Sequence, residues 1–126
     1  LLASSAASDV YKRQIIGLSQ KEHEVISGAV LFQNGIFDFN EYNVYSKNRR
    51  LLISKLAAIL SLAKSLDVEY NQKIDEIKTS IRNGTLTITA YTDSDISLEE
   101  REFNIAQEFF EEVFGIKAVL VKKGLK

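Results

Sequence analysis

The segment 77–90 reads IKTSIRNGTLTITA, and its regular alternation is the clearest structural pattern in the chain. Apolar or β-branched residues occupy every second position on both sides of Asn83-Gly84. A period of two is typical of β-strands. Asn-Gly is a strong signal for a two-residue hairpin turn, because both residues tolerate positive φ angles. The segment therefore predicts two antiparallel strands joined by a tight turn.

A helix is predicted after the hairpin, beginning at Asp95 or Ser97 and stopped by Gly115. The acidic run 99–102 is expected to be a solvated face of this helix, near the positive end of its dipole. Residues 116–122 then form a strand, which would run parallel to the strand before the helix if both share a sheet. The expected buried face of the helix consists of Phe103, Ala106, Phe110, Val113 and Phe114, supported by Ile105 and Phe109.

Two further helices are predicted before the hairpin. Ser19 and Glu22 have the spacing of a capping box, so the first helix begins there and fades near Phe32. Ser46 caps the second helix, which reaches about Leu66. The loop between them, residues 33–45, is expected to pack against the protein because it carries Phe37, Phe39, Tyr42 and Tyr45.

The second helix is apolar on most sides and is therefore expected to be central. A continuous stripe is formed by Leu52, Leu56, Ile59, Ala63 and Leu66, and it is widened by Leu51, Ile53, Leu60 and Leu62. The expected solvent edge consists of Ser54, Lys55, Ser61 and Lys64. The chain is thus predicted to be an α+β protein in which two helices precede a β-β-α-β region.

The composition excludes several classes of partner and binding site. The chain has 126 residues, of which 45% are hydrophobic, so it can fill one small core. Its formal net charge of -1 gives no global field for DNA or an anionic membrane, and neither is expected as a partner. Without cysteine there is no disulfide framework and no thiolate metal site, which fits the expected cytoplasmic location.

Residues 4–14 read SSAASDVYKRQ, which resembles the translation of a transposase-type sequencing adapter. Such segments are set aside before the fold is considered. We therefore expect residues 1–14 not to be native, residues 15–70 to be part of a helical domain, and residues 71–126 to be a small α+β extension.

Three segments together resemble the C-terminal region of the exopolyphosphatase and guanosine pentaphosphate phosphatase family (Ppx/GppA). They are GLSQKE at 17–22, RRLLISKLAAILSLAKSLD at 49–67 and FFEEVFG at 109–115. The middle segment is similar to the last helix of an HD-type helical domain. The third is similar to part of the small α+β extension that follows this domain.

This resemblance implies a parent enzyme that hydrolyses the terminal phosphoanhydride of polyphosphate or of guanosine pentaphosphate with a divalent cation, expected to be Mg²⁺. In that family the chemistry belongs to N-terminal actin-like domains, which this chain does not contain. The resemblance therefore implies an accessory region that is inactive alone, builds the substrate channel and forms a homodimer. The missing domains and polyphosphate are its expected partners.

Two positions depart from the family pattern. Lys64 stands where relatives often carry a metal-binding aspartate, and an ammonium group cannot ligate a cation. Phe32-Gln33 stands where many relatives carry a histidine, and Asp67 alone is not a site. His23 is the only histidine of the chain and is expected on the solvent side of its helix. We accordingly predict no catalytic residue, no metal ligand and no cofactor in this chain.

The remaining candidates are basic residues on or near the exposed edge of the second helix. We predict that Lys47, Arg49, Arg50 and Lys64 contact polyphosphate, with Lys55 nearby. A solvated helix face with a basic start is the simpler interpretation of the same residues. Two other functions stay open: a truncated HD-type metal phosphohydrolase, and a non-catalytic α+β interaction module.

Overall fold

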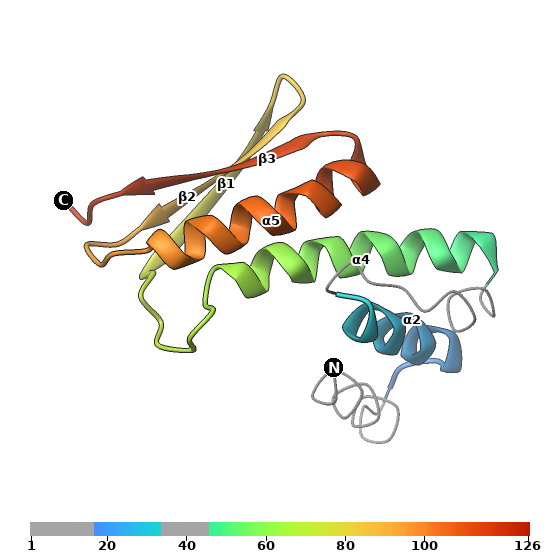
Figure 1. Cartoon of the computed structure of the whole chain (residues 1–126). Helices are drawn as coiled ribbons and strands as arrows, with labels where there is room; N and C mark the ends of the chain where they lie inside the picture. The colour runs from blue at the N-terminus through green and yellow to red at the C-terminus, as the bar shows by residue number, and fades with distance from the viewer. Residues whose placement is uncertain (1–16, 34–45) are drawn as a thin grey trace. The chain divides into compact units, whose positions relative to one another are not determined.

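A computed structural model of the chain describes residues 17–33 and 46–126. The residues 1–16, which include the adapter-like segment, and the aromatic stretch 34–45 lie outside the described residues. The elements, drawn in Figure 1, are α2 (Gln20–Leu31), α4 (Lys47–Ser65), β1 (Glu76–Arg82), β2 (Thr85–Tyr91), α5 (Ser97–Phe114) and β3 (Lys117–Lys123). The predicted α+β class, a helical part followed by a small strand region, is confirmed.

The chain divides into two compact units between Leu60 and Ser61, inside α4. The sequence suggested a boundary ten residues later, after residue 70. None of the helices in the described part of the chain is long and apolar enough to cross a membrane.

The hairpin forms as its sequence predicts. Strands β1 and β2 are antiparallel, and Arg82 pairs with Thr85 across the turn. Asn83 and Gly84 have φ angles of 52° and 71°, the positive values that a type I′ turn requires. The local sequence alone therefore sets the register of this strand pair.

Helix α5 connects β2 to β3, and these two strands are parallel. The sheet order is β1-β2-β3, so the crossover places β3 on the far side of β2 from β1. Gly115 ends α5 with a φ of 73°, as predicted. Gln107 is buried in α5, and its Oε1 accepts a hydrogen bond of 3.2 Å from the Ala118 amide, which ties the helix to the start of β3.

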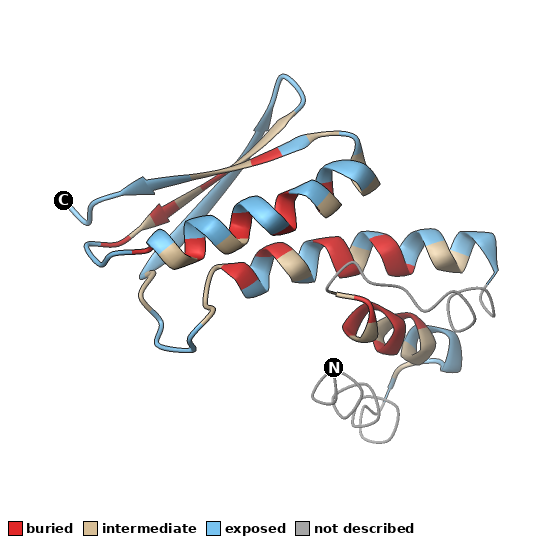
Figure 2. Cartoon of the chain, viewed as in Figure 1, coloured by how far each residue is buried: buried red, intermediate tan, exposed pale blue. Residues whose placement is uncertain are grey.

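The core of this unit lies between α5 and one face of β2 and β3. Its buried apolar residues include Ile88, Ala90, Ala118, Phe103, Ala106 and Phe110. All seven residues of β1 are exposed, which Figure 2 shows as a strand without buried positions. The expected support from Ile105 is wrong, because this side chain is 59% exposed and α5 turns it away from the sheet.

The prediction that the whole acidic run of α5 is solvated is also wrong. Glu99 is 1% exposed, and its Oε1 forms an ion pair of 3.2 Å with Lys73 Nζ. Its other oxygen, Oε2, is buried without a hydrogen-bond partner. A buried carboxylate is tolerated when a cation compensates it, and Lys73 supplies that charge from the segment before β1. The pair ties this segment to the first turn of α5.

Replacing Lys73 with alanine should strongly destabilise the protein, because it leaves the Glu99 charge buried and uncompensated. We expect a loss of about 2–4 kcal/mol in the free energy of unfolding, measured by urea denaturation. The double variant Lys73→Met/Glu99→Gln should lose less than the single variant, since it removes both charges together. Equal losses in the two variants would contradict a coupled pair.

The first unit is organised by the contact of α2 with α4. The capping box is present, since the Ser19 Oγ accepts from the Glu22 amide and Glu22 Oε1 accepts from the Ser19 amide. Ser46 caps α4 by accepting from the Arg49 amide at 3.3 Å. Gly28 of α2 lies against Ile53, and a Cβ at this glycine would stand 2.8 Å from Ile53 Cδ1. A side chain at residue 28 would therefore require Ile53 to shift.

The prediction for α4 is partly wrong: Ile53 and Leu62 are buried as expected, but no residue of the expected central stripe is buried. The residues of α4 that are buried are Ile53, Ser54, Ala57, Ala58, Leu62 and Ser65. Leu52 and Ile59, from the expected core stripe, are 47% and 48% exposed, whereas Ser54, from the expected solvent edge, is 9% exposed. Small residues at 57 and 58 and the close contact at Gly28 favour this face for packing. The opposite face keeps its leucine and isoleucine side chains exposed.

Substituting Gly28 with leucine should destabilise the first unit, because the new side chain must displace Ile53. Overpacking of this kind costs about 1–3 kcal/mol in the free energy of unfolding. The double variant Gly28→Leu/Ile53→Ala should recover part of the loss by making room. Thermal unfolding of the three proteins checks this, and an unchanged midpoint in Gly28→Leu would contradict the close approach.

Candidate anion-binding site

The predicted polyphosphate contacts separate into two groups along α4. Lys47, Arg49 and Arg50 lie in its first turn, and Lys64 lies in its last turn. At 1.5 Å per residue, Arg50 and Lys64 are about 21 Å apart along the helix axis. Lys47 and Lys64 are exposed, and Arg49 and Arg50 are half-buried. The structure therefore brings three of the four predicted residues together.

The direction of each residue around α4 follows from the helical period. At about 100° per residue, the four predicted contacts fall within roughly 160° of the helix circumference. Lys55 points to the other side of the helix and is exposed. It therefore does not extend the row formed by the four.

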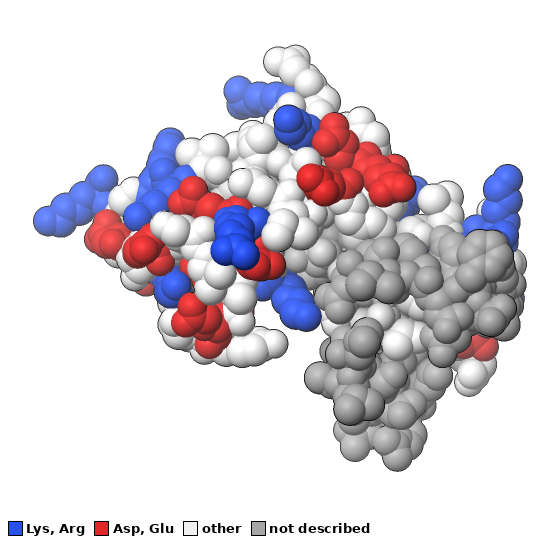
Figure 3. Space-filling view, viewed as in Figure 1, with Lys and Arg blue, Asp and Glu red and all other residues white. Residues whose placement is uncertain are grey.

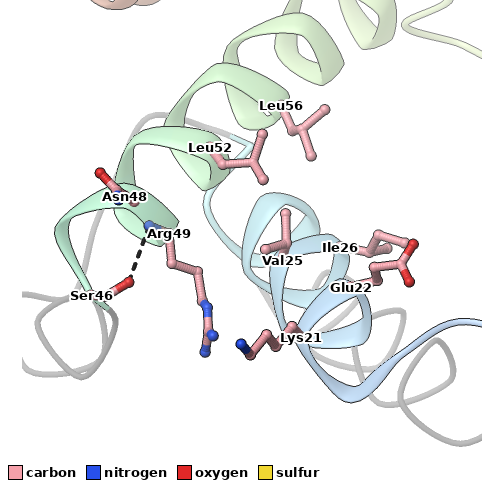
Figure 4. Close-up of a pocket in the computed structure, with 9 residues that line it drawn as sticks. All are labelled: Lys21, Glu22, Val25, Ile26, Ser46, Asn48, Arg49, Leu52 and Leu56. Atoms are coloured by element: carbon pink, nitrogen blue, oxygen red, sulfur yellow. Dashed lines mark hydrogen bonds between the residues drawn. The ribbon is translucent and has the colours of Figure 1, made fainter.

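Arg49 faces a groove between α2 and the first half of α4. This groove has a volume of about 480 Å³ and is shown in Figure 4. Its lining residues are Lys21, Glu22, Val25, Ile26, Ser46, Asn48, Arg49, Leu52 and Leu56. The Arg49 guanidinium and the Lys21 ammonium point toward each other at one end, while Leu52, Leu56 and Val25 form an apolar part. The groove thus combines an apolar wall with two convergent cations.

Glu24 holds Arg49 in this orientation. The Glu24 Oε2 pairs with Nη1 of Arg49, and the two side chains are 34% and 26% exposed. A guanidinium group has five N–H donors, so an ion pair through one nitrogen leaves donors for a second acceptor. Glu24 therefore both positions the guanidinium and partly neutralises it.

Glu22 adds a negative charge at the edge of the groove. The hydrogen bond from the Ser19 amide, followed by that from the Ser19 hydroxyl, lowers the pKa of Glu22 below its ordinary value. Its carboxylate is turned back onto the cap of α2 and remains ionised at neutral pH. The cationic end of the groove is consequently limited to Arg49 and Lys21.

Lys21 is not among the residues that the sequence pattern singles out. It lies in the first turn of α2, distant in sequence from the basic start of α4. Only the packing of the two helices brings it near Arg49 (Figure 4). The single usable signal was the capping box, which fixes where α2 begins and hence where residue 21 lies on it.

The residues considered for metal binding do not converge. Within residues 17–33 and 46–126, no three His, Asp or Glu side chains lie close enough to hold a metal ion. Asp67 Oδ1 accepts a hydrogen bond of 3.0 Å from the Gln72 amide and so stabilises the turn after α4. The prediction that His23 is on the solvent side is wrong, because this residue is half-buried and its Nε2 is buried without a partner.

Elsewhere, acidic and basic side chains are interspersed on the visible surface, as Figure 3 shows. No broad field of one sign covers the described residues on this face. No protein family, no characterised protein and no solved structure was found to match this chain.

Proposed function

We propose that this chain is the accessory C-terminal region of an enzyme resembling the exopolyphosphatase and guanosine pentaphosphate phosphatase family. In this role it supports catalytic domains that carry out the phosphoanhydride hydrolysis with Mg²⁺, and the parent works in the cytoplasm as a homodimer. The basic start of α4, with Lys64 at its other end, contacts the polyphosphate chain. The fragment by itself does not catalyse the reaction.

The exposed apolar face of α4 is the observation that carries the support role. Leu52 and Ile59 are 47% and 48% exposed, and Leu56 lies between them along the same face of the helix. Large apolar side chains gathered on one helix face mark a packing surface, since isolated ones are common but contiguous ones are not. A helix that is buried on one side and apolar on the other suits a position inside a larger helical domain.

The polyanion contact is supported by the chemistry of the α4 start. Arg49 and Lys21 converge in Figure 4, and Lys47 and Arg50 lie in the same turn of α4 as Arg49. Guanidinium groups suit phosphate oxygens because they donate two parallel hydrogen bonds. The site has few cations and a neighbouring carboxylate, so weak binding is expected.

The interaction-module alternative is favoured by the apolar lining of the groove. A cavity of about 480 Å³ with an apolar wall and few polar groups has the size and composition of many ligand sites. This reading predicts that an apolar partner binds and that polyphosphate does not. Nothing in the described residues specifically favours the truncated metal phosphohydrolase.

The length of the polyphosphate should decide which basic residues contribute to its binding. A short polyphosphate reaches only the first turn of α4, so Arg49→Ala/Arg50→Ala should weaken its binding about tenfold while Lys64→Ala leaves it unchanged. The binding of a polyphosphate chain long enough to follow α4 should be weakened by both sets of substitutions. Calorimetric titration at low salt measures the two lengths, and raising the salt should weaken both.

Two matched variants sharpen this test. Lys55→Ala removes one positive charge from the other side of α4 and should not alter binding. Glu24→Gln removes the carboxylate that competes for Arg49 and should tighten binding about twofold to fivefold. Binding that survives the joint change of Lys47, Arg49, Arg50 and Lys64 to alanine would overturn the assignment.

The fragment should release no phosphate from polyphosphate in the presence of Mg²⁺. The proposed role assigns bond cleavage to other domains, and this chain contributes only contacts. A colorimetric phosphate assay with purified protein, run beside a buffer blank, measures the rate. Robust release that scales with protein concentration would contradict the accessory role.

A further inference from the structure

We propose that strand β1 pairs with β1 of a second copy of this chain, forming a continuous six-stranded sheet across a two-fold axis. The surface is the outer edge of the sheet, formed by residues 76–82. The pairing follows from the sheet alone and would stand if the proposed function failed. It specifies a surface and a register for self-association.

Strand β1 is an exposed edge strand whose charged residues, Glu76, Lys78 and Arg82, carry both signs. It lies at the end of the order β1-β2-β3, all seven of its residues are exposed, and it contains no proline. Ile77 and Ile81 are 48% and 66% exposed on the sheet face that α5 covers over β2 and β3. An edge of this kind is a template for pairing with another strand.

The backbone of β1 is oriented for such pairing. In a two-residue hairpin the residues that flank the turn form a hydrogen-bonded pair, and such pairs alternate with non-bonded pairs along the ladder. Arg82 and Thr85 flank the turn, so the peptide groups of residues 76, 78, 80 and 82 face β2. The peptide groups of Ile77, Thr79 and Ile81 therefore face the free edge.

The sequence of β1 is complementary to itself when it is read in the opposite direction. With Thr79 opposite its own copy, EIKTSIR places Glu76 opposite Arg82, Ile77 opposite Ile81 and Lys78 opposite Ser80. Each copy contributes one residue to every pair. By symmetry, the Glu76–Arg82 pair and the Ile77–Ile81 pair therefore both occur twice. Opposite charges and apolar residues in directly facing positions stabilise antiparallel strands.

The neighbouring registers are disfavoured. Peptide groups that face outward on one strand must meet peptide groups that face outward on the other. The sum of the numbers of two facing residues can therefore change only in steps of two. Centring the pairing on residue 78 would place Lys78 opposite Lys78, and centring it on residue 80 would place Lys78 opposite Arg82. Only the Thr79 register pairs all seven residues without opposing like charges.

The other edge of the sheet is protected against the same association. Strand β3 begins with Lys117 and ends with Lys122 and Lys123, so an antiparallel β3–β3 pair in full register would oppose lysine with lysine. Lysines on an edge strand are a common defence against pairing. Assembly through β1 therefore stops at a closed dimer, as a two-fold interface requires.

The test is the oligomeric state of the full chain and its charge-reversed variants, measured by analytical ultracentrifugation. The wild type should dimerise, and Arg82→Glu should raise the dissociation constant about tenfold to a hundredfold, because Glu76 then meets a second carboxylate twice. Glu76→Arg should do the same. The double variant Glu76→Arg/Arg82→Glu should restore the dimer, since it exchanges the two charges.

Arg101→Glu, an exposed substitution on α5 with the same charge change, should leave the dimer intact. Circular dichroism confirms that each variant is folded. A wild type that is monomeric at several hundred micromolar would overturn the proposal. This holds even if β1 is then found to pair with an extended segment of another protein. A dimer that persists in both single variants, or a double variant that stays monomeric, would also overturn it.

A covalent cross-link gives an independent measure of the register. The chain has no cysteine, so Thr79→Cys introduces a single thiol that faces its own copy across the two-fold axis. Facing residues in a hydrogen-bonded pair have Cα atoms about 5.5 Å apart, within the range of a disulfide. Air oxidation should cross-link this variant rapidly and Ser80→Cys slowly, because residue 80 faces residue 78. Equal rates would reject the Thr79 register.

Discussion

Strand β2 carries the constraint on which the strand-bearing unit depends, because it must be hydrogen-bonded along both edges. On one side it pairs with β1 through a two-residue turn, and on the other it pairs in parallel with β3. A parallel neighbour cannot be reached by a tight turn, so the chain must cross over the sheet. Helix α5 is that crossover, and its apolar side covers Ile88, Ala90 and Ala118.

This arrangement also determines what the sheet leaves open. Helix α5 contacts β3, since it must deliver the chain to that strand, and the core lies over β2 and β3. One helix is too narrow to cover three strands, so the same face of β1 remains exposed with Ile77 and Ile81. The segment before β1 is instead secured by Lys73, which pairs with the buried Glu99 at the start of α5. The free edge is thus held in a fixed position by interactions elsewhere in the unit.

Local patterns predicted the elements and their boundaries well. The Asn83-Gly84 turn, the Ser19 capping box and the Gly115 stop each act within a few residues, so the sequence contains their whole cause. The choice of buried face on α4 depended on a partner. This helix is apolar on most sides, and in its first half the side that packs is the one that meets α2, as Ile53 does at Gly28.

The same distinction explains the residues that sequence reasoning placed wrongly or missed. Glu99 belongs to an acidic run that is typical of a solvated face, and its compensating cation lies 26 residues away. Lys21 and Arg49 are 28 positions apart and meet only through the packing of α2 on α4. Charges compensate through space, so a run of like charges says little about which member is buried.

The two open surfaces of the chain differ in how closely they specify a partner. The apolar face of α4 offers burial without direction, because the hydrophobic effect depends on area and accepts many shapes. The edge of β1 offers peptide groups at fixed spacing and charges in a fixed order, so a shift of one residue misplaces every contact. A non-directional surface suits permanent burial inside a domain, where covalent connection supplies the specificity. A directional edge can select its partner by itself, and the sequence of β1 matches its own reverse.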